Sequence, residues 1–104
     1  MERIWLEPWT EVEKSKVGLF ESELRRELTP QHILFNISVV AVGRSARADD
    51  TLFELQGHEY EYAVVHLTWM GSREENTSFP HTELYANWKA FQQRMSEDNY
   101  GYDE

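Results

Sequence analysis

The chain has 104 residues, contains no cysteine and carries a net charge of −9 at pH 7, which excludes disulfides, thiolate chemistry and zinc sites that need cysteine ligands. A hydrophobic fraction of 40% and a charged fraction of 28% are typical of one globular domain large enough to bury a core. The negative charge argues against nucleic acid, whose phosphates bind clustered Lys and Arg, and favours a protein partner, in particular a basic one.

No segment has the pattern of a targeting or membrane sequence. The first residues, MERIWLEPW, include acids and have no apolar run long enough for a signal peptide. No stretch approaches the roughly 20 apolar residues of a membrane span. We therefore expect a cytoplasmic protein that does not enter a membrane.

A helix is predicted in the first third of the chain. Thr10 and Glu13 fit a capping box, in which both side chains accept amide hydrogen bonds at a helix start. Apolar residues then recur at helical spacing: Trp9, Val17, Phe20, Leu24 and Leu28. Gly18 lies inside this pattern and costs about 1 kcal/mol relative to Ala, so a start only near Ser15, or a kink there, is the alternative. The Thr-Pro pair at 29–30 ends the helix, because a residue before proline avoids the α region.

Three strands are predicted in the middle of the chain. The segments 37–47, 51–56 and 60–69 are rich in β-branched and aromatic residues and are separated by turn residues. Tight turns between such segments favour an antiparallel meander. Gly43, inside the first of them, marks a bulge or a bend.

The last third of the chain is predicted to form a strand and a helix. Residues 82–86 alternate between the two faces of a strand, and a helix starting at Thr82 is the alternative. Asn87 is the predicted N-cap of a short amphipathic helix in which Trp88, Phe91 and Met95 recur on one side.

These elements predict an α+β domain over residues 1–96, with a four-stranded antiparallel meander in the order α-β-β-β-β-α. We expect both helices to pack on one face of the sheet, because an antiparallel sheet can leave its other face to water. Residues 97–104 are acidic and poor in aliphatic residues, which predicts a disordered tail.

Alternation along the strand at 60–69 assigns the two faces of the sheet. Ala63, Val65, Leu67 and Trp69 are predicted to lie in the core beneath the helices. The opposite face is predicted to be exposed and is the candidate binding surface; it carries Tyr60, Tyr62, His66, Thr68, Glu83 and Tyr85. Of the other tryptophans, Trp88 is expected in the core, whereas Trp5 and Trp9 either pack under the first helix or join a dimer contact.

Three segments of the sequence together resemble one known family: HILF at 32–35, YAVVHLTW at 62–69 and FPHTELY at 79–85. The chain resembles, over roughly residues 24–95, a family of small uncharacterised bacterial proteins that have an AVVHLTW-like strand and a TELY-like segment before a short helix. This chain has Ile33 where the family pattern has proline. The resemblance implies a single cytosolic domain and, because the family has no assigned activity, it supplies no catalytic residues.

The residues give little support to catalysis. The histidines at positions 32, 58, 66 and 81 lack a metal-binding spacing such as HExxH, so we expect no metal or other cofactor. Acid–base chemistry would depend on His66 or on the sheet carboxylates Glu54, Glu61 and Glu83. The sequence has no nucleophile elbow and no phosphate-binding glycine loop.

The sequence therefore predicts a non-enzymatic protein-binding module that uses the aromatic face or its acidic rim. An immunity-type or antagonist role against a basic protein fits its size and charge as a class analogy. Two alternatives stay open. One is a homodimer formed through the aromatic face or a sheet edge, and the other is a small metal-binding protein or enzyme centred on His66.

Overall fold

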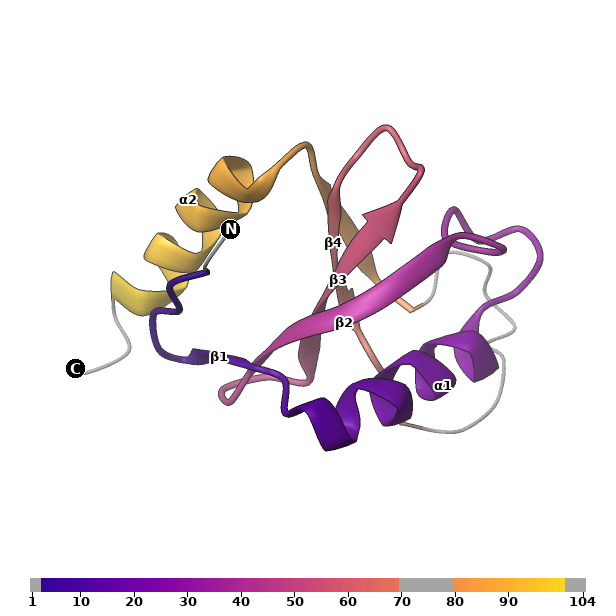
Figure 1. The fold of residues 1–104 in the computed structure, drawn as a ribbon, viewed down its shortest axis with the longest axis horizontal. Helices are drawn as coiled ribbons and strands as arrows, with labels where there is room; N and C mark the ends of the chain where they lie inside the picture. Colours follow the sequence, from indigo (N-terminus) through magenta and orange to yellow (C-terminus); the bar gives the residue numbers. More distant parts are fainter. Residues whose placement is uncertain (1–2, 70–79, 101–104) are drawn as a thin grey trace.

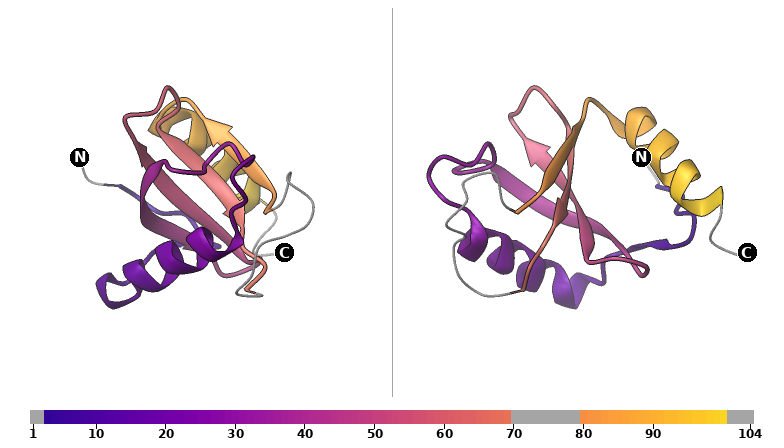
Figure 2. Two further views of the ribbon diagram at one scale, coloured as in Figure 1. Left: turned by 90° about the vertical axis from the view of Figure 1, so that its right-hand side faces the viewer. Right: turned by 180° about the vertical axis from the view of Figure 1, so that it is seen from behind.

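The computed structural model describes residues 3–69 and 80–100. Its elements are β1 (Trp9–Glu11), the 3-10 turn η1 (Lys14–Lys16), α1 (Val17–Glu27), β2 (Ser38–Ser45), β3 (Asp50–Gln56), β4 (Tyr62–His66), β5 (Thr82–Tyr85) and α2 (Trp88–Tyr100). In this part of the chain the strands form one antiparallel sheet in the order β1-β2-β3-β4-β5. The helices lie on opposite sides of it, so the fold has three layers (Figures 1 and 2). The predicted α+β meander is confirmed, and β1 adds a fifth strand to it.

The start of the chain differs from the predicted capping box. Thr10 lies in β1, paired with Arg44 of β2, and α1 begins only at Val17 after the η1 turn. The alternative of a start near Ser15 is thus confirmed. Trp9 explains the difference, since its side chain is 1% exposed in the sheet layer and its burial draws the preceding segment into a strand.

The four predicted strands are present with small shifts at their ends, and the segment at 82–86 is a strand rather than a helix. The bulge expected at Gly43 is confirmed by a register shift between Ala41 and Gly43. A Cβ atom at this glycine would clash with the ring of Trp5. The glycine therefore lets the indole pack directly on the backbone of the sheet.

The last helix begins as predicted. Asn87 Oδ1 accepts a hydrogen bond from Ala90 N at 2.9 Å, which caps the helix start. The helix continues to Tyr100, so residues 97–100, predicted to belong to a disordered tail, are helical. Residues 101–104 lie outside the described part of the chain. No helix in the described part is long and apolar enough to span a bilayer.

One face of the sheet forms the predicted core. Ala63, Val65 and Leu67 are at most 1% exposed and pack in one cluster with Phe20 and Leu24 of α1. The odd-numbered residues of β4 therefore point inward beneath α1, as alternation predicts.

The expectation that both helices share this face is wrong. Trp88, Phe91 and Met95 of α2 pack in a second cluster with Tyr62 and Val64, on the even face of β4. The physical reason is visible in β3, where consecutive side chains, Leu52 and Phe53, are both 0% exposed. Since consecutive residues of a strand point to opposite faces, this sheet is apolar on both sides and needs a cover on each.

The amino-terminal segment completes the second core. The Trp9 ring meets Phe91 edge-on at 5.0 Å, and Trp5 meets Trp88 at 5.3 Å. The indole N–H of Trp9 donates to Asp98 Oδ2 at 2.8 Å, as a buried tryptophan requires. These two tryptophans therefore pack beneath α2 and not beneath the first helix.

Candidate functional site

The predicted binding face is largely covered. Tyr62 is 2% exposed, because its ring lies 5.6 Å from the Trp88 ring of α2 and beneath the guanidinium of Arg3. Its hydroxyl accepts a hydrogen bond from Arg3 Nη2 at 3.0 Å and donates to Glu54 Oε2 at 3.4 Å. Burial raises the pKa of Tyr62. The expectation of an exposed Tyr62 is therefore wrong, and this residue belongs to the core.

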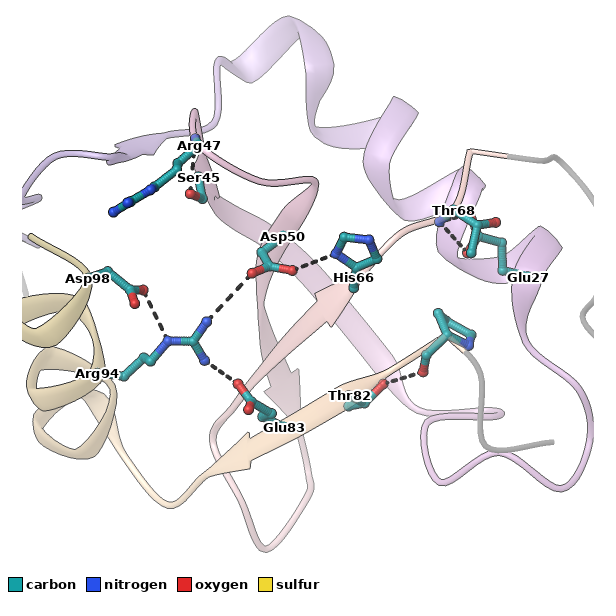
Figure 3. Close-up of polar contacts among 11 residues, drawn as sticks. Glu27, Ser45, Arg47, Asp50, His66, Thr68, Thr82, Glu83, Arg94 and Asp98 are labelled. Atoms are coloured by element: carbon teal, nitrogen blue, oxygen red, sulfur yellow. Dashed lines mark hydrogen bonds and ion pairs between the residues drawn. The ribbon is translucent and has the colours of Figure 1, made fainter. Parts of the chain in front are cut away.

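The other five predicted site residues are dispersed. Tyr60 is 37% exposed in the β3–β4 turn, where its backbone N–H donates to His58 Nδ1. The backbone N–H of Thr68 points toward α1, where it donates to the Glu27 carboxylate. Only His66, Glu83 and Tyr85 share one neighbourhood. Arg94 of α2, which was not among the predicted residues, contacts Glu83 and Tyr85 directly. It reaches His66 through Asp50 (Figure 3).

Arg94 lies at the centre of a polar cluster that joins α2 to β3, β4 and β5 (Figure 3). Its guanidinium forms ion pairs with Asp98 at 3.0 Å, with Asp50 at 3.5 Å and with Glu83. Nη1 also donates to Tyr85 Oη at 3.0 Å. Burial lowers its pKa, but contacts with Tyr85 and the carboxylates outweigh burial and raise it. With its donors occupied by these partners, Arg94 holds the second helix on the sheet.

His66 contacts this cluster from its edge. Its Nδ1 lies 3.0 Å from Asp50 Oδ1, and its side chain is 52% exposed. A His–Asp pair of this kind can orient an imidazole for acid–base chemistry. Within residues 3–69 and 80–100, no group of three or more His, Asp or Glu side chains is placed to hold a metal ion. His32 is buried elsewhere, between Pro80 O and Leu34 N.

A buried carboxylate fixes the segment that follows β4. Glu27, at the end of α1, is 0% exposed, and its oxygens accept hydrogen bonds from Thr68 N and Trp69 N at 2.9 Å each. Burial is the main cause that raises the pKa of Glu27 to about 7. Hydrogen bonding and charge repulsion from the neighbouring Glu23 raise it further, and the two backbone donors lower it. Both carboxylates lie on the sheet side of α1.

Trp69 departs from the expectation that it lies in the core. It is 41% exposed, and its backbone has φ +60°, a left-handed conformation that is strained for a bulky residue. Because β4 ends at His66, strand alternation no longer decides where residue 69 points. The indole instead lies edge-on against Phe20 of α1, with ring centroids 5.4 Å apart.

The indole borders a hollow of about 240 Å³ between the start of α1 and the β2–β3 turn. We call it the Trp69 hollow and define it by Lys16, Leu19, Phe20, Arg44, Asp49, Asp50 and Trp69. Leu19 is 53% exposed. The Arg44 guanidinium lies 5.9 Å from the Phe20 ring centroid. Two exposed apolar side chains, a buried ring, two cations and two aspartates thus meet at one place on the surface.

The sequence contained a signal for part of this site. Glu23 and Glu27 fall three and seven residues after Phe20, within the apolar stripe of the first helix. A carboxylate at such a position is buried, and it then requires hydrogen-bond partners. The left-handed conformation of Trp69 had no such signal, because glycine and asparagine are the residues that mark it.

Comparison with known proteins gives no relative for this chain: no protein-family model, no curated protein and no solved structure matches it. The resemblance to a small bacterial family therefore stays a prediction. Function has to be argued from the geometry of this chain.

Proposed function

We propose that this chain is a non-enzymatic protein-binding module that contacts its partner through the Trp69 hollow. The observation that supports it most is Trp69 itself, whose indole is 41% exposed on a backbone of φ +60°. Such a conformation costs on the order of 1–3 kcal/mol and persists only where the surroundings enforce it. Here the buried Glu27 carboxylate enforces it through the N–H groups of residues 68 and 69.

Tryptophan is the type of residue that dominates protein interfaces when it inserts into a partner. A rigid, half-exposed indole also loses little conformational entropy on binding. Together with Leu19, 53% exposed on the same hollow, it forms an apolar patch that water solvates poorly.

The size of the hollow favours a protein partner over a small molecule. Its volume of about 240 Å³ is below the roughly 300–1,000 Å³ of most ligand sites. It suits one or two side chains of a docking segment. The net charge of −9 would add long-range attraction to a partner that is basic overall, as in the antagonist class considered above.

The test is partner capture by variants that differ at one exposed apolar residue. Wild type, Trp69→Ser and the control Ile33→Ser, at a position 56% exposed outside the hollow, are immobilised and exposed to a cell extract. A protein retained by wild type and by the control but lost with Trp69→Ser supports the proposal. Retention of the same proteins by all three folded baits contradicts it. Thermal melting confirms that each variant is folded.

A second candidate function, homodimerisation, is favoured by the outer edge of β5. The bond from His66 N to His81 O, 2.9 Å long, fixes the alternation of the β4–β5 pair. The N–H and C=O groups of Thr82 and Leu84 consequently point away from β4. An edge of this kind can accept a strand from a second copy. Light scattering at two concentrations tests it, with Thr82→Pro, which removes an outward N–H, as the variant that should stay monomeric.

A further inference from the structure

We infer that the partner segment filling the Trp69 hollow carries a carboxylate next to a large apolar side chain. This inference rests on the proposed function and adds the chemistry of the segment that is bound.

The cations of the hollow lack anionic partners in the described part of the chain. Lys16 and Arg44 form no ion pair within residues 3–69 and 80–100, whereas Arg3 and Arg94 both do. Of the two aspartates that line the hollow, Asp50 is already paired with Arg94. The lining thus has two cations and two carboxylates, and among the charges that form no ion pair in the described residues the two cations face one acid, Asp49.

The position of Lys16 is also unfavourable for the helix. It directly precedes α1, whose first turn has no acidic residue. The amino end of a helix has a partial positive charge, so a cation there lowers helix stability and an anion raises it. A carboxylate from a partner would relieve this repulsion and would lie within reach of Arg44, on the same hollow.

The apolar half of the hollow requires a second feature of the ligand. Leu19 and Trp69 are both more than one-third exposed and lie on its wall with the buried ring of Phe20. A leucine or phenylalanine beside the acid would cover these groups and remove apolar surface from water. The acid alone would bind weakly, because an exposed ion pair contributes little.

Cations next to an aromatic ring could instead bind phosphates and bases. The total charge of −9 opposes this, since a nucleic acid would meet repulsion over most of the surface. Single-stranded oligonucleotide is therefore included in the test as a competing ligand.

The experiment measures binding of capped, fluorescently labelled hexapeptides by anisotropy. The peptides contain Asp-Phe, Asn-Phe, Lys-Phe or Asp-Ala in a Gly/Ser background, and oligo-dT is the nucleic-acid probe. We expect the Asp-Phe peptide to bind about fivefold or more tightly than Asn-Phe at low salt, and this preference to shrink in high salt. Equal binding of the Asp, Asn and Lys peptides, or tighter binding of oligo-dT, would overturn the inference.

Variants locate the preference and separate it from the proposed function. Lys16→Ser and Arg44→Ser should lower the ratio of Asp-Phe to Asn-Phe affinity, whereas Lys89→Ser, an exposed cation on α2, should not. Trp69→Ser should weaken all Phe peptides. Binding that depends on Trp69 but not on the acid of the peptide would agree with the proposed function and refute the inference that the bound segment carries a carboxylate. Binding unaffected by Trp69→Ser refutes both.

Discussion

Replacing Glu27 by Gln should remove a pH dependence of stability. The wild-type chain should show this dependence between the pKa of Glu27 in the unfolded chain and the pKa of Glu27 in the folded chain. Burial is the largest cause that raises the pKa of this carboxyl from 4.5 to about 7, and its side chain is 0% exposed. In this window the folded chain keeps a proton that the unfolded chain has lost. The free energy of unfolding therefore falls as pH rises through the window, and is highest below it.

The magnitude follows from the shift. At about 1.4 kcal/mol per pKa unit, a change from 4.5 to about 7 corresponds to a loss of about 3 kcal/mol once the pH exceeds the folded value. Coupling to Glu23 distributes part of this loss over both carboxyls. Glutamine has nearly the same shape, and its amide oxygen can still accept hydrogen bonds from Thr68 N and Trp69 N, but it does not titrate.

Urea unfolding of both proteins from about pH 5 to pH 8 measures the effect. The histidines and the acids other than the coupled Glu23 are common to both chains, so their titration cancels in the difference between the two stabilities. Glu13→Gln, which changes an exposed acid just before η1, is the matched control and should follow the wild-type profile. Parallel profiles for wild type and Glu27→Gln would refute the reasoning, because Glu27 would then titrate alike in the folded and unfolded states.

Three further predictions concern packing and backbone geometry. Tyr62→Ala should lower the free energy of unfolding by about 3–5 kcal/mol, measured by urea unfolding; a loss as small as at an exposed site would contradict the placement of its ring beneath α2. Gly43→Ala should destabilise by about 1–3 kcal/mol through overpacking, whereas Gly18→Ala, with nothing within 4 Å of the new methyl group, should stabilise by about 1 kcal/mol; equal effects at the two glycines would argue against the tryptophan contact at position 43. Trp69→Gly should be more stable than Trp69→Ala by about 1 kcal/mol, because only glycine adopts a positive φ without strain. If thermal melting ranks these two variants in the opposite order, the backbone at 69 is not strained.

Local pattern was sufficient to predict most of the elements. Alternation and β-branching gave the strands at 38–45, 50–56, 62–66 and 82–85, because each strand has at least one face whose burial imposes a period of two. Asn87 gave the start of α2 for an equally local reason, since the cap and the amide it satisfies are three residues apart.

The placement of α2 required information that is not local. Nothing within the helix states which face of the sheet it will cover. The choice depends on Trp9 and Trp5, more than 75 residues away in the chain, whose rings complete the second core with Phe91 and Trp88. The capping-box pattern at Thr10 was outweighed by the burial of Trp9, a case of tertiary packing overriding a local preference.

The same lack of long-range information limited the prediction of the candidate site from the sequence. Tyr62 was predicted to be exposed because its face of the sheet was taken as uncovered, and Trp69 was predicted to be buried because alternation was extended past the end of β4. Both errors arise where a side chain's direction is set by a contact with a distant element: Trp88 for Tyr62, and Glu27 for Trp69. The acids inside the apolar stripe of α1 were readable from the sequence, but the backbone groups they bind were not.

Glu27 and Trp69 each have an energetic cost, and the two residues are in direct contact. Their pairing argues for function more strongly than either residue alone. A buried carboxylate with a raised pKa is a weak source of stability, and apolar residues of similar volume often replace such groups without loss. A non-glycine residue at positive φ costs energy that glycine would avoid. Glycine at position 69 would remove the backbone cost. Leucine at position 27 would remove the cost of burying the carboxylate, but it would leave the N–H groups of residues 68 and 69 without this acceptor. The two costs are instead joined by the hydrogen bond from Trp69 N to Glu27 Oε2, and its result is an indole held at the surface. The presentation of that ring is the property of the pair that supports the proposed binding function.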